Sequence, residues 1–177
     1  MPRYVALLRG VNVGGSGRMA MADLRACVEG AGFEDVATHI QTGNVLVRTS
    51  MRSAEKVAGA LEKAVAADLG FRTAVMVRTA AQLTAALDER PFPGADAAAL
   101  HIAFLRETPS AARAKALVAP EGPDELAVVG REGYLHYPDG QGRSKLTGAL
   151  IEKALGVPAT ARRRSVVEKL RELLLAD

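Results

Sequence analysis

The fold is decided by two segments, residues 4–15 (YVALLRGVNVGG) and residues 36–47 (VATHIQTGNVLV). Each joins strand-forming apolar residues to glycines and side-chain amides. Residues 4–8 form an uninterrupted apolar run, as expected of a strand that is covered on both faces. In the second segment, two strand-like runs flank QTGN, and Gly and Asn tolerate the positive φ angles of a tight turn. We therefore predict a buried first strand and a β-hairpin.

Two helices and a further strand complete the first half. Apolar residues recur at helical spacing from Met21 to Ala31, and again at every fourth position from Val57 to Leu69. Glycines at 32 and 70 are suitable helix ends. Residues 72–77 are predicted to form a strand. The resulting order, β-α-β-β-α-β, is the ferredoxin-like arrangement with right-handed crossovers.

The second half repeats much of this order after a short helix and a helix-breaking cluster at residues 90–94, RPFPG. Ser144 is the expected N-cap of the second helix in this half. We predict no final strand, and instead expect Thr160 to cap a last amphipathic helix. The other predicted elements are a helix at 80–87, a strand at 100–105, a helix at 110–118, a hairpin of 125–129 with 134–137, and a helix ending at residue 155.

The predicted fold class is therefore α+β. It has two ferredoxin-like halves of the βαββαβ type with antiparallel sheets, and the second half ends in a helix. We expect an N-terminal half at residues 1–79, a helix and Pro/Gly linker at 80–99, and a C-terminal half at 100–177.

Composition favours a globular protein in the cytoplasm. Of the 177 residues, 49% are hydrophobic and 24% are charged, which is ordinary for a soluble domain. No segment approaches the roughly 18 consecutive apolar residues that span a bilayer, and the first residues do not resemble a secretory signal. The single cysteine excludes an internal disulfide. We expect no membrane association.

Positive charge is concentrated at the C-terminal end. Residues 143–177 hold eight Lys or Arg against four Asp or Glu, whereas the whole chain has a net charge of +3. A localised basic surface attracts anions such as phosphate or nucleic acid, although such surfaces are also common without any ligand.

Four segments together resemble the family called domain of unknown function 1697. They are residues 7–15 (LLRGVNVGG), 40–45 (IQTGNV), 140–146 (GQGRSKL) and 160–167 (TARRRSVV). The family comprises small bacterial proteins without an established activity, so the resemblance implies a fold and candidate site residues, and no reaction. The last segment departs from the family's TxRNWNTV-like pattern, because Arg163, Arg164, Ser165 and Val166 replace Asn, Trp, Asn and Thr.

The first candidate site is the loop at residues 9–18, between a strand and a helix. Free backbone N–H groups at a helix start favour an anion. Arg9 supplies forked donors, Asn12 can donate and accept, and Gly14 and Gly15 allow a ligand close to the backbone. The spacing matches neither a Rossmann fingerprint nor a P-loop. The alternative is that Asn12 and the glycines only adopt left-handed turn conformations.

The second candidate is the hairpin turn. The side-chain amides of Gln41 and Asn44 could form hydrogen bonds with the donors and acceptors of a ligand. Alternatively, they could close the turn through hydrogen bonds to the local backbone. The turn role is favoured for Asn44, and the binding role for Gln41.

The third candidate comprises Arg143, Ser144 and Lys145, which follow a strand and precede a helix. Cations at a helix start oppose the helix dipole, so a bound anion or solvation must offset them. A Ser144–Lys145 catalytic dyad is disfavoured because adjacent helical residues point about 100° apart. Arg162 could add a further cation, while the neighbouring Arg163 and Arg164 fit a solvated helix start.

No reaction or cofactor can be assigned from these residues. The three histidines are isolated, without metal-ligand spacing, so no metal is predicted. Cys27 lies on an apolar helix stripe and fits a small core residue. The seven aromatic residues are scattered and form no stacking platform for single-stranded nucleic acid.

The leading hypothesis is a protein that binds a phosphorylated or otherwise anionic small ligand, whether as an enzyme or not. Both glycine loops could then face one cleft. One alternative is a nucleic-acid-binding module that uses the basic C-terminal region. The other is a structural protein that acts through a partner interface. The oligomeric state is not predicted.

Overall fold

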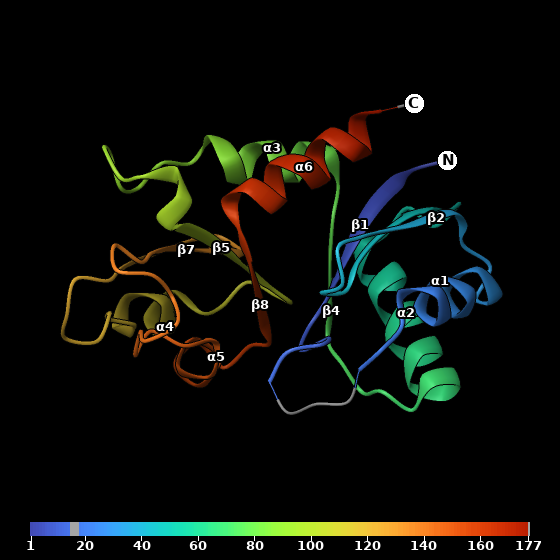
Figure 1. The fold of residues 1–177 in the computed structure, drawn as a ribbon, viewed down its shortest axis with the longest axis horizontal. Coiled ribbons are helices and arrows are strands. Elements are labelled where there is room, and N and C mark those ends of the chain that lie inside the picture. The colour runs from blue at the N-terminus through green and yellow to red at the C-terminus, as the bar shows by residue number, and fades with distance from the viewer. Residues whose placement is uncertain (15–17, 177) are drawn as a thin grey trace. The chain divides into compact units, whose positions relative to one another are not determined.

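The computed structural model describes residues 1–14 and 18–176. By its internal contacts the chain divides into two units. Unit 1 comprises Met1–Gln82 with Leu170–Asp177, and unit 2 comprises Leu83–Lys169. In chain order (Figure 1), the elements are β1 (Arg3–Leu8), α1 (Met21–Gly30), β2 (Glu34–His39), β3 (Asn44–Arg48), α2 (Ala54–Leu69), β4 (Val75–Arg78), α3 (Ala80–Asp88), the short 3-10 helix η1 (Ala97–Ala99), β5 (Leu100–Leu105), α4 (Ala111–Ala116), β6 (Glu125–Val129), β7 (Glu132–His136), α5 (Gly148–Leu155), β8 (Ala159–Arg163) and α6 (Arg164–Leu175).

Unit 1 has the predicted ferredoxin-like topology. Its strands lie in the order β2-β3-β1-β4, and every neighbouring pair is antiparallel. The predicted covered first strand is confirmed, because all residues from Tyr4 to Leu8 are buried. The Ser53 side chain accepts a hydrogen bond at the start of α2, and Gly70 ends this helix at φ 63°. The predicted end of α2 at Gly70 is therefore confirmed, whereas the Ser53 cap was not predicted.

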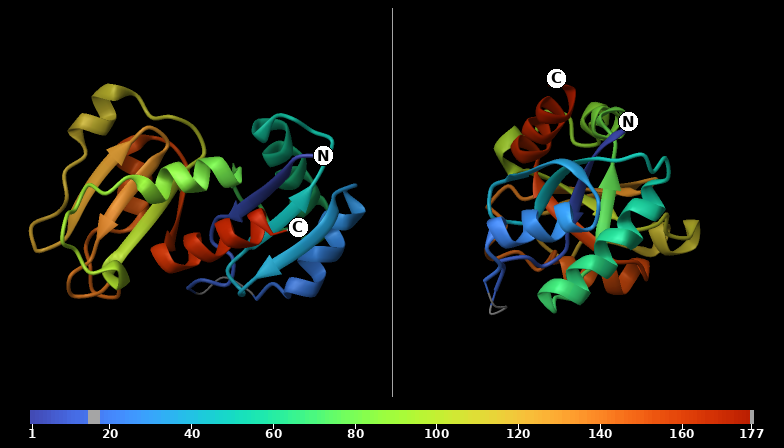
Figure 2. Two further views of the ribbon diagram at one scale, coloured as in Figure 1. Left: turned by 90° about the horizontal axis from the view of Figure 1, so that it is seen from above. Right: turned by 90° about the vertical axis from the view of Figure 1, so that its right-hand side faces the viewer.

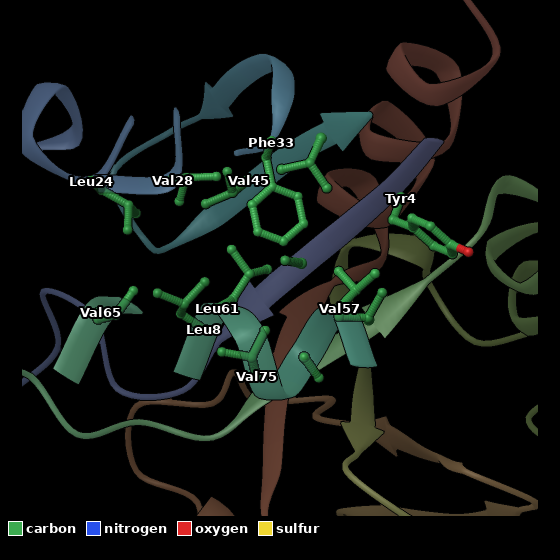
Figure 3. Close-up of a cluster of buried hydrophobic side chains, with 14 of the residues drawn as sticks. Tyr4, Leu8, Leu24, Val28, Phe33, Val45, Val57, Leu61, Val65 and Val75 are labelled. Atoms are coloured by element: carbon green, nitrogen blue, oxygen red, sulfur yellow. The ribbon is translucent and has the colours of Figure 1, made fainter. Parts of the chain in front are cut away.

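The core of unit 1 lies between its sheet and the helices α1 and α2. Figure 3 shows Leu24 of α1, Leu61 of α2 and the Phe33 ring among the side chains of this cluster. Cys27 belongs to this cluster, as predicted for a small core residue, and burial raises the pKa of its thiol. Burying one Leu or Val side chain stabilises a fold by about 1.5–3 kcal/mol, so this cluster fixes the register of the sheet.

One edge strand of this sheet, β2, is irregular. The register against β3 shifts between Glu34 and Ala37, and Asp35 has a positive φ of 49°. The Asp35 carboxylate forms an ion pair with Arg48, with Nε 3.0 Å from Oδ2. A bulge with an acidic residue makes an edge strand a poor template for another strand.

The end of α6 is held by a residue from the start of the chain. The guanidinium of Arg3 donates hydrogen bonds to the carbonyl oxygens of Leu173, Leu174 and Ala176. These last carbonyls have no partner within a helix, and a cation there also offsets the helix dipole. Arg3 therefore acts as a cap for α6.

Unit 2 repeats the topology, with strand order β6-β7-β5-β8 and antiparallel pairs throughout. The side chains of Ala103, Leu135 and Ile151 belong to a core between this sheet and the helices α4 and α5. Tyr134 lies on the opposite face, where its hydroxyl donates to the carbonyl of Ala86 in α3 at 2.9 Å. Figure 2 shows the unit's strands from two further sides.

The prediction that unit 2 lacks a final strand is wrong. Residues Ala159–Arg163 form β8, which pairs with β5 along its whole length, from Leu105↔Ala159 to His101↔Arg163. Thr160 lies inside this strand and does not cap a helix. The final helix begins at Arg164. Within the part of the chain that the structure describes, each helix is too short or too polar for a membrane span.

Candidate functional site

Asn12 holds the opening loop of unit 1 together. Its Nδ2 donates to the carbonyl oxygens of Met19 at 3.0 Å and Gln41 at 2.7 Å, and its Oδ1 accepts from the Met19 N–H at 2.6 Å. The backbone of Asn12 has φ 54° and that of Gly14 has φ 62°, as the left-handed turn alternative predicts. The amide thus ties both ends of the loop to the β2–β3 turn.

The hairpin turn is also braced from within. Asn44 is fully buried, and its Nδ2 donates to the His39 carbonyl at 3.0 Å and to Thr42 Oγ1 at 3.1 Å. The geometry thus favours the turn role of Asn44. Gln41 contributes its carbonyl oxygen to Asn12, while its side chain is exposed. Ile40 is also exposed and has φ 52°, an unusual conformation for a β-branched residue.

The other predicted ligand-binding residues of this loop have fewer described side-chain contacts than Asn12. Arg9 is exposed, and its backbone is held by Ala74 and by the Thr73 hydroxyl, which donates to the Arg9 carbonyl at 2.7 Å. Gly14 is exposed as well. Gly15 lies outside the described residues. The helix α1 begins after Ala20, which offers no side-chain cap.

The loop at residues 138–147 in unit 2 is ordered by its own hydrogen bonds. The Ser144 hydroxyl donates to the Asp124 carboxylate and accepts from the Leu146 N–H at 2.9 Å. The Tyr137 hydroxyl donates to the Leu146 carbonyl at 2.9 Å. Burial, with a smaller contribution from Asp124, raises the pKa of this hydroxyl to about 12, so that it stays protonated and keeps donating. The loop backbone is therefore fixed on both sides of Lys145.

Two cations of this loop take no part in that bracing. Arg143 and Lys145 are exposed, and neither side chain has a hydrogen-bond or ion-pair partner among the described residues. The predicted N-cap role of Ser144 is wrong, because Thr147 caps α5 by accepting from the Leu150 N–H at 3.2 Å. Ser144 acts earlier, by fixing the turn that leads into the helix.

The predicted basic helix start is largely buried. Arg162 is 8% exposed and donates to Thr160 Oγ1 at 2.7 Å and to the Ala161 carbonyl at 2.9 Å. Burial lowers the pKa of the Arg162 guanidinium to about 10, which leaves it charged at neutral pH. Arg164 is 6% exposed and donates to the Leu87 carbonyl at 2.9 Å. The solvated alternative is therefore wrong for Arg164, whereas Arg163 is exposed.

His101 is a buried histidine in β5, where it pairs with Arg163 of β8. Its Nδ1 has no hydrogen-bond partner among the described residues, and its ring meets the ring of Tyr137 edge-on at 5.0 Å. Burial, helped by the positive charge of Arg163, lowers the pKa of His101 below 6.5. A neutral imidazole is thus the form that the folded protein favours.

His101 should make the stability of the protein depend on pH. The unfolded chain binds a proton near pH 6.5 and the folded chain only at lower pH, so the free energy of unfolding should fall as the pH drops below 6.5. We expect His101→Phe, which keeps an aromatic ring, to flatten this dependence in urea unfolding measured from about pH 7.5 to pH 5. Equal slopes for the wild type and the variant would contradict the assignment.

Two partners of the candidate loops were not predicted. Asp124 fixes Ser144 from 20 residues away, and Thr73 holds Arg9 from 64 residues away. Both contacts depend on strands that meet only in the folded sheet. No local sequence pattern marks these residues.

The fold and these loops define a class of α+β protein with two ferredoxin-like units. A family described as "Protein of unknown function (DUF1697)" matches residues 1–134, which include the opening loop and the hairpin, and the chain belongs to this family. The structure is similar to that of conserved bacterial protein SP0830 from Streptococcus pneumoniae, with a TM-score of 0.70 and 23% identity over 99% of each chain. At this identity the likeness concerns the fold. A search of curated proteins found no match.

Proposed function

We propose that this protein binds a phosphorylated or otherwise anionic small molecule, and that the loop at residues 138–147 supplies the main contacts. One observation carries the proposal: Arg143 and Lys145 are exposed, without a hydrogen-bond or ion-pair partner in the described part of the chain, on a backbone that Ser144, Asp124 and Tyr137 hold in place. Cations on a fixed loop can bind an anion without the cost of ordering that loop. Arg143 offers forked donors for a phosphate or carboxylate, and Lys145 offers a point charge.

The opening loop of unit 1 is a second candidate for anion binding. Its support is that Arg9 and Gly14 are both exposed in the loop before α1, where Ala20 offers no side-chain cap. The Asn12 amide is already occupied by Met19 and Gln41, so we do not include it among the contacts. The single cysteine of the chain suits the reducing cytoplasm that we propose as its location.

The nucleic-acid alternative is less well supported by the geometry. Of the three consecutive arginines at 162–164, only Arg163 is exposed, so this segment presents less charge than its sequence suggests. A phosphate-tracking surface needs several exposed cations and shows steep salt dependence. No described contact favours such a surface over the loop at 138–147.

Thermal shift against phosphorylated metabolites, nucleotides and inorganic phosphate tests the proposal, followed by calorimetry on any compound that stabilises the protein. Charge-assisted hydrogen bonds contribute about 1.5–3 kcal/mol each, so the double variant Arg143→Gln, Lys145→Gln, which removes two of them, should weaken binding by about 100-fold or more. The double variant Lys115→Gln, Lys153→Gln removes the same charge from exposed positions of unit 2 and should bind normally. Equal affinity in both double variants, or no stabilising compound at all, would refute the proposal.

A further inference from the structure

We infer that β6 is a dimerisation edge, at which two copies of this chain join their β6 strands antiparallel about a two-fold axis through Ala127. The inference concerns an interaction surface of unit 2 and does not depend on the proposed ligand.

The outer side of β6 carries free backbone groups. The strand pairs with β7 in an unbroken register from Glu125↔His136 to Val129↔Glu132, across a two-residue turn. In such a hairpin the residues next to the turn share hydrogen bonds, and alternate residues direct their N–H and C=O groups outward. Leu126 and Val128 are the outward residues. Their outward groups have no partner among the described residues.

The equivalent edge of unit 1 shows what β6 lacks. Strand β2 occupies the same place in its sheet, but it is interrupted by a bulge and by Asp35 at φ 49°. Edge strands are commonly protected by bulges, prolines or charges that prevent further pairing. Apart from Glu125 at its first position, β6 contains no charge, proline or bulge, and Val129 is 43% exposed. This regular apolar edge can therefore accept another strand.

A second β6 fits this edge in one register. With Ala127 on the two-fold axis, Leu126 of each copy lies opposite Val128 of the other, so that all of their outward N–H and C=O groups pair. The apolar side chains of these two residues, which pack at the rim of the unit 2 core, also face each other. The pairing thus joins backbone complementarity to apolar contact, which are the two requirements of strand addition.

The charges around β6 favour antiparallel pairing of two copies over parallel pairing. Asp124 and Glu125 lie at the start of the strand, and Arg131, followed by Glu132, lies after its end. Antiparallel pairing brings the acidic start of one copy beside Arg131 of the other and keeps the two acidic starts apart. Parallel pairing would instead place like charges together, which opposes association.

Sedimentation of the full chain from micromolar to millimolar concentration tests the inference. Wild type should shift with concentration from 18.6 kDa toward twice that mass. Ala127→Lys and Ala127→Glu each place like charges directly across the axis, so each variant alone should stay monomeric. An equal mixture of the two variants should dimerise again, because the axis then joins opposite charges. Ala37→Lys, on the exposed β2 edge, is the matched control and should dimerise like wild type.

Each remaining outcome decides against the inference. A wild-type chain that stays monomeric at millimolar concentration has no such edge. A dimer that persists in both single variants is formed by another surface. A mixture that fails to dimerise, while circular dichroism shows both variants folded, excludes direct pairing at Ala127.

Discussion

Replacing Gly43 with alanine should lower the free energy of unfolding by about 3 kcal/mol, combining a left-handed backbone penalty with overpacking. Gly43 has φ 80°, and an added Cβ would lie 3.0 Å from Leu8 Cβ and 3.0 Å from Val11 Cβ and Cγ2. Leu8 and Val11 are both 1% exposed, and their Cβ atoms are attached directly to the backbone. The carbonyl of Gly43 also accepts from the Leu8 N–H at 2.9 Å, so the turn cannot move away freely.

Gly10→Ala separates the two causes of this loss. Gly10 has φ 75°, close to that of Gly43, but nothing lies within 4 Å of an added Cβ. Its variant should lose only the conformational part, about 1–2 kcal/mol. Urea unfolding of both variants measures the difference. Equal losses would show that the turn relaxes and that the contact with Leu8 and Val11 is unimportant.

Replacing Asn12 with alanine should cost about 2–3 kcal/mol, because it removes three hydrogen bonds of a half-buried amide. The loss should fall on the loop, so the amide of Met19 should exchange with deuterium faster in the variant. Gln41→Ala is the control. It removes an exposed side chain and keeps the carbonyl that Asn12 contacts, so we expect less than about 0.5 kcal/mol.

The result for Asn12 also distinguishes two roles for the opening loop. If Asn12→Ala is as stable as wild type, the amide does not close the loop in solution and is free to meet a ligand. A loss of stability together with unchanged ligand affinity would assign Asn12 to the fold alone.

The sequence predicted unit 1 more completely than unit 2. In unit 1, β1 is an apolar run, α1 and α2 have a clear apolar period, and Gly70 marks the end of α2. The strand β8 was missed because Ala159 and Ala161, which face the core, are small, while Thr160 and Arg162 are polar but buried. That pattern has no apolar alternation to detect. The similar order of elements in the two halves was the one indication in the sequence that a strand should precede the final helix.

The candidate site was predictable only in part. The strand-to-helix loops were located correctly, because glycines and cations between two periodic segments mark them in the sequence. The bracing of Ser144 by Asp124 was not predictable, since it depends on the start of β6 lying beside the entry to α5. The solvated helix start expected at Arg164 was wrong for a similar reason, because a contact between distant residues decides it. Burial of Arg164 follows from its bond to the Leu87 carbonyl, a contact 77 residues away.

The capping of α6 by Arg3 has a consequence for biosynthesis. Residues 170–177 belong to unit 1 with the first 82 residues of the chain. Translation proceeds from the N-terminus, so all of unit 2 leaves the ribosome before unit 1 has its last helical turns. The unit whose synthesis starts first is thus the one completed last, and a nascent chain stalled before residue 170 would leave the Arg3 guanidinium without the carbonyls that it holds in the finished protein.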